Sequence, residues 1–211
     1  HAADAIRGGQ LWDRWWTVNG ASQPAGNHPL YPLAGLQSGS TTFRCKECHG
    51  WDYKGAAGAY GSGSHFTGIP GVFGSTLTAV EMTDIIKTTI VTNGHGFELY
   101  GLTDTDIADL VEFIQTLVID TDLYVDSAKD FIGDAVQGRT NYESVSVPAC
   151  TLCHGNEGTA LNFATPDDPE WVGTIAVANP WELLHKIRVG NPGSSMPSWV
   201  GTSRFCSSCF T

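Results

Sequence analysis

Few basic residues and no long hydrophobic run characterise this chain. Its 211 residues include 11 Lys and Arg against 22 Asp and Glu, so the formal net charge at pH 7 is −11. Nucleic-acid binding needs basic patches that neutralise phosphates, so a general nucleic-acid role is excluded. No stretch approaches the roughly eighteen apolar residues that a membrane-spanning helix needs, so we expect a protein that does not span a membrane.

The acidity and the N-terminus bear on partners and location. An acidic surface favours docking to a basic partner surface, but acidity also keeps a protein soluble without any partner, and the sequence leaves both explanations open. The first residues, His1 to Asp4, lack the charged and apolar regions of a signal peptide, so we expect that any such peptide has already been removed.

Two copies of the pattern C-x-x-C-H stand out. The first comprises Cys45, Cys48 and His49, and the second comprises Cys150, Cys153 and His154. This pattern is the attachment signature of c-type haem. The three-residue step sets two thiols at the separation of the two haem vinyl groups, and the adjacent imidazole can bind the iron as proximal ligand. The sequence therefore predicts two covalently attached haem c groups.

Cysteine pairs also bind zinc or take part in thiol redox reactions. The two pairs begin 105 residues apart (150 − 45), which is far beyond the spacing of a zinc ribbon. A thioredoxin-like pair needs a βαβ surrounding, whereas the flanks here are typical of loop and helix. Haem is therefore favoured at both motifs.

A third cysteine pair, Cys206 and Cys209, has no histidine after it, so a third haem is not expected. Haem is attached to such motifs outside the cytoplasm, which indicates a periplasmic or extracellular protein, and spare thiols tend to pair there. We expect a disulfide between these two residues, with an intermolecular link or a metal site as alternatives.

Hydrophobic periodicity predicts helices around both motifs. In the first half the predicted helices cover residues 5–16, a segment from about residue 78 that ends at 93–94, and residues 103–118. Gly8 and Gly9 in the first of them permit a close helix crossing. Thr103 and Asp106 form a capping box at the start of the third. The second half repeats the order with a weaker helix at 131–142 and a clear one at 181–189. Residues 200–211 are too short and too poor in apolar period for a closing helix.

This pattern predicts an all-α, loop-rich protein of two domains with little or no β structure. The first domain covers residues 1–120 and contains a long insertion at 17–44. A linker follows at 121–130, and the second domain covers 131–211 without an obvious C-terminal helix.

A haem iron in an electron-transfer protein usually takes a sixth ligand from Met or His. The chain has only two methionines, Met82 and Met196. Met196 lies in a loop after the last predicted helix, 42 residues beyond His154 (196 − 154), which favours it as the distal ligand of the second haem. Met82 falls in a predicted apolar helix with Val80, Ile85, Ile86 and Ile90, so we expect it to fill the core.

The order of helix, C-x-x-C-H-G, Gly-rich loop, helix and M-P-S ligand loop resembles class I cytochrome c, twice in tandem. The first domain departs from that family's pattern because the position of the ligand loop holds His95, 46 residues beyond His49 (95 − 49), and no methionine. The resemblance therefore implies His/His ligation at the first haem, with His95 favoured, and His/Met ligation at the second.

Other histidines compete with His95 or have simpler explanations. His65 is the main competitor, and it could instead contact a haem propionate or lie in solvent. His28 is expected to order the insertion around it, His185 to lie at the surface or contact a propionate, and His1 to be a free terminus.

The resemblance implies electron transfer between a donor and an acceptor redox protein, without any substrate being transformed. Met/His ligation raises a haem potential, so the first haem is expected to have the lower potential. Two alternatives remain. The chain could be an electron-transfer subunit of a larger oxidoreductase or haem filament, which would explain the missing helix, or a dihaem enzyme such as a peroxidase or a sulfur-compound dehydrogenase.

Overall fold

The computed structural model describes residues 2–88, 94–144 and 150–200, and the chain divides into two compact units. The first unit contains His1–Asp120 and Val189–Met196, and the second contains Thr121–Arg188 and Pro197–Thr211. Each unit is described by itself below.

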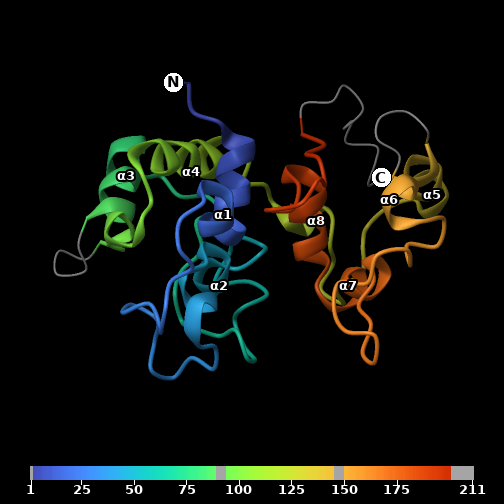
Figure 1. The fold of residues 1–211 in the computed structure, drawn as a ribbon, viewed down its shortest axis with the longest axis horizontal. Coiled ribbons are helices and arrows are strands. Elements are labelled where there is room, and N and C mark those ends of the chain that lie inside the picture. The colour runs from blue at the N-terminus through green and yellow to red at the C-terminus, as the bar shows by residue number, and fades with distance from the viewer. Residues whose placement is uncertain (1, 89–93, 145–149, 201–211) are drawn as a thin grey trace. The chain divides into compact units, whose positions relative to one another are not determined.

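The first unit is built from four α-helices and two short 3-10 helices among its described residues (Figure 1). In chain order these elements are α1 (Ala5–Asn19), η1 (Gly39–Phe43), α2 (Cys45–His49), α3 (Ala79–Lys87), η3 (Phe97–Tyr100) and α4 (Asp104–Thr116). The predicted helices at 5–16, from residue 78 and at 103–118 are therefore confirmed, with shifts of a few residues at their ends.

The second unit is also helical where the structure describes it. Its elements are η4 (Thr121–Leu123), α5 (Ala135–Glu143), α6 (Cys150–His154), α7 (Val172–Ala178) and α8 (Pro180–Val189). Within the described ranges, β structure is limited to two isolated bridges, between Gly55 and Pro70 and between Val125 and Phe131. The prediction of an all-α, loop-rich fold is confirmed. The same described residues include no helix long and apolar enough to cross a membrane.

Two features of the second unit differ from the predicted segments. The helix expected at 131–142 begins later, at Ala135, because the Asp134 side chain caps its first turn and accepts hydrogen bonds from two backbone N–H groups. Phe131 pairs with Val125 in a bridge instead. Helix α7 was not predicted, since its short Val-Gly-Thr-Ile-Ala-Val-Ala sequence lacks a clear apolar period.

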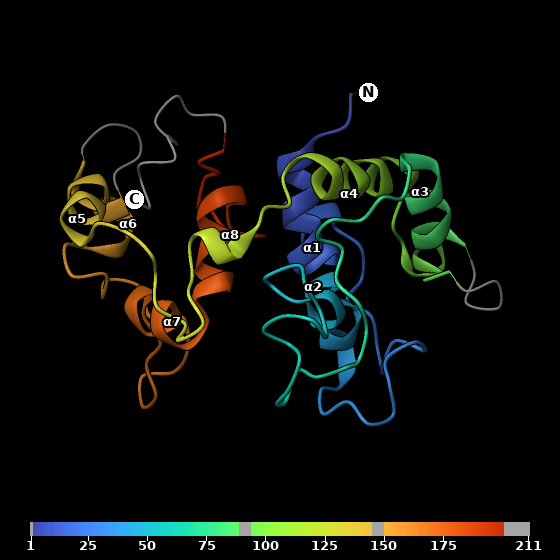
Figure 2. The ribbon, with the colours of Figure 1, turned by 180° about the vertical axis from the view of Figure 1, so that it is seen from behind.

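Helices α1 and α4 cross closely and lie side by side in both ribbon views (Figures 1 and 2). A Cβ atom added at Gly8 would lie 1.9 Å from the backbone oxygen of Asp109, so only glycine allows this approach. Around the crossing, the helices bury Leu11, Trp12, Trp15, Ile107, Leu110 and Phe113. The predicted close crossing at Gly8 and Gly9 is thereby confirmed.

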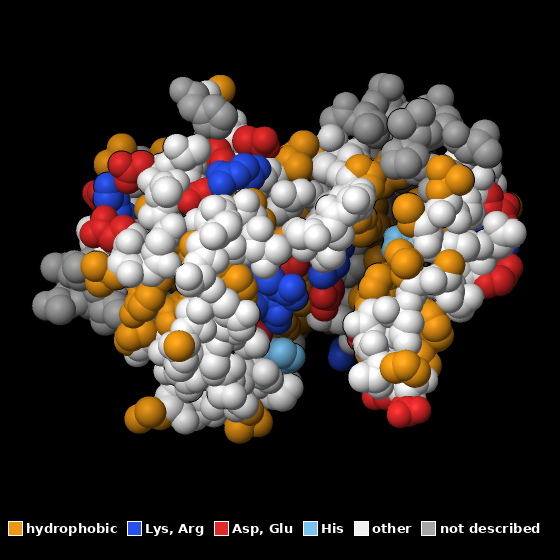
Figure 3. Space-filling model, in the orientation of Figure 1, with side chains coloured by type: hydrophobic (Ala, Val, Ile, Leu, Met, Phe, Trp, Pro, Cys, Tyr) orange, Lys and Arg blue, Asp and Glu red, His pale blue; other side chains and the backbone are white. Residues whose placement is uncertain are grey.

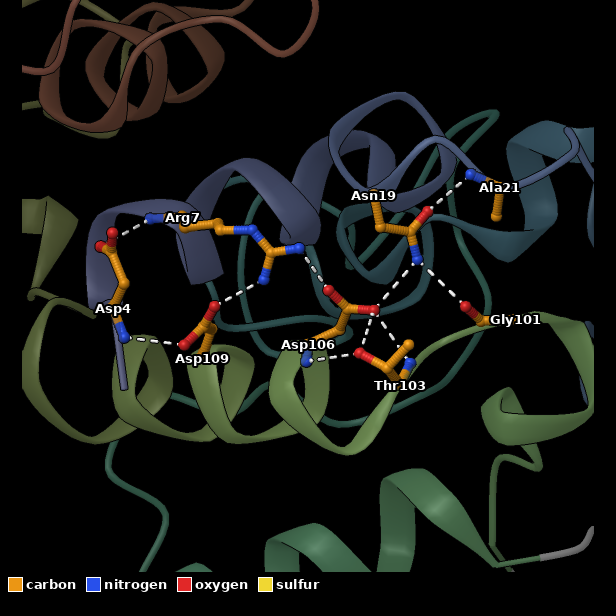
Figure 4. Close-up of polar contacts among 8 residues, drawn as sticks. All are labelled: Asp4, Arg7, Asn19, Ala21, Gly101, Thr103, Asp106 and Asp109. Carbon is orange, nitrogen blue, oxygen red and sulfur yellow. Dashed lines mark hydrogen bonds and ion pairs between the residues drawn. The ribbon is translucent and has the colours of Figure 1, made fainter. Parts of the chain in front are cut away.

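Polar contacts hold the same two helices in register (Figure 4). The Arg7 guanidinium forms ion pairs with Asp106 and with Asp109, the latter at 2.6 Å. At the other end of α1, Asn19 donates to Asp106 Oδ2 at 3.1 Å and to the backbone oxygen of Gly101 at 3.0 Å. Because both carboxylates are buried, these donors compensate the cost of removing them from water.

The two longer helices after the haem motif both begin with a capping box. In α4, Thr103 Oγ1 accepts from the Asp106 N–H at 3.2 Å and Asp106 Oδ2 accepts from the Thr103 N–H at 2.9 Å, as the sequence predicted. In α3, Thr78 and Glu81 form the same reciprocal pair, which sequence analysis had not identified.

Two side chains differ from expectation. Val80 of the predicted apolar helix is 70% exposed, because it lies two residues before the buried Met82 and so about 200° around the helix from it. His185 is 1% exposed, so a surface position is wrong, since it shares a buried face of α8 with Val189 four residues later. Its alternative, a contact with a propionate, stays a prediction. Met82 fills the core as expected. The predicted absence of a closing helix at 200–211 and the disulfide between Cys206 and Cys209 lie outside the described residues.

Candidate haem-binding sites

Helix α2 presents the first cysteine pair and its histidine on a single short helix. It follows directly on η1, whose Phe43 is buried and fixes the start of the turn. Burial raises the pKa of Cys45 and of Cys48 to about 12. Both thiols are therefore protonated at neutral pH when no metal is bound.

The His49 imidazole is oriented by the loop that follows it. Its Nδ1 lies 2.7 Å from the backbone oxygen of Pro70, and since a carbonyl oxygen can only accept, Nδ1 carries the proton. Pro70 is held in place by its bridge to Gly55, whose φ of +54° favours glycine. Burial lowers the pKa of His49 to about 4. The ring is therefore neutral at neutral pH, with Nε2 free to bind a metal.

His95 lies opposite His49, with 6.0 Å between the two ring centroids. Its Nδ1 lies 3.0 Å from the backbone oxygen of Ile85, and its backbone N–H donates to the same oxygen at 2.7 Å. Burial lowers the pKa of His95, so this ring too is neutral and keeps Nε2 available. The structure thus brings two of the predicted ligands together with matching tautomers.

The separation of these two rings can be compared with the size of a metal centre. Metal–imidazole bonds are about 2 Å long, so two nitrogens that bind one ion from opposite sides lie about 4 Å apart. Adding the distance from each nitrogen to the centre of its ring places the centroids about 6 Å apart. The pair of His49 and His95 therefore fits a haem iron bound between the rings.

A buried tryptophan beside His49 also fits a cofactor with polar groups. The Trp12 ring centroid lies 5.8 Å from that of His49, and its indole Nε1 is buried without a hydrogen-bond partner among the described residues. Leaving such a donor unsatisfied costs about 1–3 kcal/mol. The carboxylates of a haem are acceptors of the kind that this N–H lacks.

His65, the competing candidate, contacts Glu47 and Tyr60. Its Nδ1 lies 2.7 Å from Glu47 Oε1, and its ring stacks on Tyr60 at a centroid distance of 4.8 Å. Glu47 is fully buried and also accepts from Lys46 Nζ at 2.9 Å. Burial alone would raise the pKa of Glu47, but the bonds from His65 and Lys46 outweigh it and hold the pKa below its usual range. His65 therefore belongs to a hydrogen-bonded cluster with Glu47 and Lys46, whereas the ring that lies 6.0 Å from His49 is that of His95.

Sequence analysis missed this cluster because it lies in the two variable positions of the motif. Lys46 is 5% exposed, with its ammonium 5.4 Å from the centroid of the Trp51 ring, and Arg44 lies 5.7 Å from the same ring. Trp51 thus packs against two cations, and one of them, Lys46, pairs with the buried Glu47. The partner of Glu47, His65, lies 18 positions away, and that separation carries no signal in the sequence.

The second motif forms α6, and its histidine is less firmly held. The Tyr142 hydroxyl donates to the backbone oxygen of Gly155 at 2.7 Å, and the Ala160 N–H donates to that of His154 at 3.0 Å. The Phe163 ring lies 6.0 Å from the His154 ring. His154 Nδ1 is buried without a hydrogen-bond partner among the described residues. The turn is thus anchored, but its imidazole lacks the carbonyl contact that orients His49.

Apolar side chains are exposed around this second motif, and orange side chains are spread over the second unit in Figure 3. Leu152, between the two cysteines, is 79% exposed, and Leu161 and Phe163 are also exposed. These side chains fit a large apolar cofactor that would cover them. Met196 falls in Val189–Met196, which belongs to the first unit, whereas His154 belongs to the second. Their pairing as axial ligands stays a prediction.

Comparison with known proteins bears on the first unit. No curated protein and no solved structure matches the chain at a level of similarity that shows a relationship. The family model for cytochrome c matches residues 36–118, which include Cys45, Cys48, His49 and His95. Residues 36–118 of this chain are therefore similar to cytochrome c, a family whose members bind haem c covalently and transfer electrons.

Proposed function

We propose that this chain is a dihaem c-type cytochrome that transfers single electrons between redox proteins. The observation that carries the proposal is the facing pair of His49 and His95, whose rings are 6.0 Å apart and whose Nδ1 atoms are both taken up by backbone oxygens. These two imidazoles would hold the iron of a bound haem. With both ligand positions supplied by the protein, no position would remain for a substrate, which favours electron transfer over catalysis.

In the first unit, Cys45 and Cys48 form the thioether bonds, His49 is the proximal ligand and His95 the distal one. The haem supplies a one-electron iron couple. The chain's residues exclude water from that couple and fix its ligands, because Trp12, Tyr53 and Phe113 pack around the His49 side of the site. When water is excluded and the ligands are fixed, the surroundings of the iron change little between its two oxidation states. The reorganisation energy of electron transfer would then be small.

We also propose that Cys150 and Cys153 bind the other haem, with His154 as its proximal ligand and Met196, which falls in the Val189–Met196 segment of the first unit, as its distal one. The second C-x-x-C-H sequence, the short helix that it forms and the exposed apolar side chains near it support this assignment. Because Met/His ligation raises a haem potential relative to His/His, we infer that the first haem has the lower potential and that electrons settle on the second.

The same proposal covers location and partners. Covalent haem attachment supports a periplasmic or extracellular protein. A formal charge of −11 favours donor and acceptor proteins that present basic surfaces, with no role for nucleic acid.

One alternative has an observation in its favour. Val136, Leu152 and Val177 are each more than three-quarters exposed in the second unit. Apolar surface of this kind is typical of a protein interface, so the chain could be an electron-transfer subunit of a larger oxidoreductase or of a haem filament. A dihaem enzyme, such as a peroxidase or a sulfur-compound dehydrogenase, would need an open iron, which the facing histidines disfavour.

Visible and near-infrared spectra of the oxidised holoprotein test the ligand assignment. We expect a bis-imidazole low-spin signal that His95→Ala replaces with a high-spin signal at half of the haem. His65→Ala is the matched control, because it removes a histidine of the same unit, and it should leave the spectrum unchanged. Loss of the bis-imidazole signal in His65→Ala but not in His95→Ala would contradict the assignment.

A further inference from the structure

A second buried histidine, His28, contacts the backbone of His95 across the fold. His28 comes from the long insertion at 17–44 and is 5% exposed. Its Nε2 lies 3.0 Å from the backbone oxygen of His95. Sequence analysis expected this residue only to order its own loop, and nothing in the separation of 67 positions indicates the contact.

The hydrogen bonds of His28 determine its tautomer. The Leu30 N–H donates to Nδ1 at 3.2 Å, so Nδ1 carries the lone pair. Nε2 therefore carries the proton and donates to the His95 carbonyl, which can only accept. A single neutral tautomer satisfies both contacts, and the two ring nitrogens link the insertion to the segment that holds His95.

The His28 ring is fixed on all sides by aromatic packing and by its backbone. It stacks on Phe97 at a centroid distance of 5.1 Å and meets the edge of Phe43 at 5.0 Å. Its backbone N–H donates to Thr42 Oγ1 at 2.8 Å. Phe97 stacks in turn on His95 at 6.0 Å, so His28 and His95 both pack against the same ring. A rigid group thus supports the His95 backbone.

The backbone N–H groups of this segment donate to α3 and to the residue that follows it. The His95 N–H donates to the backbone oxygen of Ile85, and the Gly96 N–H donates to that of Thr88, directly after α3. Among the described residues, the bond from His28 ties the His95 segment to the insertion. Without it, the carbonyl of His95 would lose this hydrogen bond and would have to accept one from water.

We propose that His28 is a positioning residue for the first haem: its Nε2–H holds the His95 backbone and so keeps the His95 imidazole on the iron. The proposal rests on His95 being the distal ligand. His28 acts through His95, and it slows the opening of the segment that would expose the iron to other ligands. The long insertion then has a function, since it carries the donor that closes the site.

The test is the rate at which cyanide binds to the ferric holoprotein, because cyanide must displace His95 to reach the first iron. His28→Phe keeps the ring and its stacking but loses both nitrogens. His28→Asn retains an acceptor near the Nδ1 position, and His28→Gln retains a donor near the Nε2 position. We expect cyanide to bind about tenfold faster in the Phe and Asn variants, the effect of losing one hydrogen bond of ordinary strength. His28→Gln should restore a rate close to that of the unchanged protein.

A control separates this role from general loosening of the insertion. Asn27 Oδ1 accepts from the Gly39 N–H at 2.7 Å, so Asn27→Ala weakens the same loop without touching His95. Cyanide should bind Asn27→Ala at the unchanged rate. An equal increase in Asn27→Ala and His28→Phe would overturn the proposal, as would unchanged rates in all three His28 variants. If His28→Phe does not fold, the contrast between the Asn and Gln variants decides.

These outcomes are distinguishable from failure of the proposed function. If His95→Ala abolishes the bis-imidazole spectrum while the His28 variants bind cyanide at the unchanged rate, the ligand assignment stands and the role of His28 falls. If His95→Ala leaves the spectrum unchanged, the ligand assignment itself is wrong, and the proposed role of His28 falls with it.

Discussion

Glu47 is a buried acidic residue whose charge is stabilised by neighbouring side chains. It lies between the two cysteines of the first motif, is fully buried and pairs with Lys46 and His65. A buried carboxylate is costly unless it is paired, and breaking such a pair costs about 3–5 kcal/mol. With a haem attached at this turn, the negative charge of Glu47 would favour the ferric state of its iron.

Neutralising this carboxylate should raise the midpoint potential of the first haem. We expect Glu47→Gln, which keeps the shape of the side chain, to shift that potential upward by tens of millivolts, on the order of one charge acting through partly screened protein. Spectroelectrochemical titration measures the shift. Glu98→Gln removes the same charge from an exposed position of the first unit and should change the potential far less. Equal shifts of the midpoint potential in the two variants would contradict the prediction that the buried position of Glu47 gives its charge the larger effect.

At the scale of elements, the crossing of α1 and α4 forms the core of the first unit, against which the C-x-x-C-H turn of α2 packs. The helices approach so closely at Gly8 that a Cβ atom would meet the Asp109 backbone oxygen at 1.9 Å. Their ends are tied by Arg7 and Asn19 to the acidic side chains of α4. Both the contact and these polar interactions depend on α1 being a helix that begins at Ala5, directly after Asp4, whose side chain caps its first turn.

Enlarging the residue at the crossing should destabilise the first unit. Gly8→Ala forces two backbones apart, so we expect the free energy of unfolding to fall by about 1–3 kcal/mol or more, measured by denaturant titration. Gly138→Ala is the matched control, because Gly138 is also helical but has no atom within 4 Å of an added Cβ. It should stabilise α5 by about 0.5–1 kcal/mol. A stabilising effect at both positions would contradict the close crossing.

The ion pair and hydrogen bonds of Asp106 in α4 should make the free energy of unfolding depend on pH. Burial alone raises the pKa of Asp106, but hydrogen bonds from Thr103 and Asn19 and the Arg7 guanidinium outweigh it and hold the pKa below 3.8. A lowered folded-state pKa contributes stability that is fully present above the unfolded value and is lost as pH falls through the folded value. Asp106→Asn should therefore destabilise the protein at pH 7, with a difference that vanishes in strong acid.

Measuring unfolding of both proteins from pH 7 to pH 2 checks this prediction. Asp104→Asn serves as the control, because its side chain is 83% exposed and pairs only with Lys87 at the surface. Exposed pairs contribute little, so this variant should stay close to the parent at every pH. A difference for Asp106→Asn that persists unchanged at pH 2 would contradict the ion-pair explanation.

At the scale of the whole molecule, the two C-x-x-C-H motifs are unequal. The first lies in a unit with a cytochrome c match, an oriented His49 and a second histidine, His95, whose ring lies 6.0 Å from it. The second has an anchored turn, a histidine whose Nδ1 lacks a partner among the described residues, and exposed apolar side chains. The proposed functions of the two sites follow from this difference.

Intact mass and redox titration together test the dihaem proposal. We expect the mass of the chain plus two haems, and replacing Cys150 and Cys153 by serine should remove one haem while the bis-imidazole spectrum persists. The remaining haem should be the one with the lower potential in the unchanged protein, since it lacks methionine ligation. A single haem in the unchanged protein, or loss of the bis-imidazole signal in the double variant, would contradict the proposal.

Local patterns in the sequence were sufficient for α1, α3, α4 and α8, for the capping box at Thr103 and for the close crossing at Gly8. Each of these depends on residues near one another in the chain or on a glycine without a side chain. The same patterns did not indicate α7 or the capping box at Thr78. The cysteine pairs and their histidines are equally local, since one turn of helix sets their spacing. The same local patterns misjudged Val80 and His185, whose burial depends on which face of a helix another element covers.

Only the tertiary structure decided which distant groups meet. It placed His95 opposite His49 while His65 pairs with Glu47, and it brought His28 from the insertion onto the His95 backbone. These contacts join residues 18 to 67 positions apart, and the separations carry no signal in the sequence. The sequence by itself determined the C-x-x-C-H chemistry of haem attachment, because two thiols and an imidazole at that spacing need only one turn of chain. The tertiary structure decided which other side chains lie near this turn, because loops distant in the sequence pack around it.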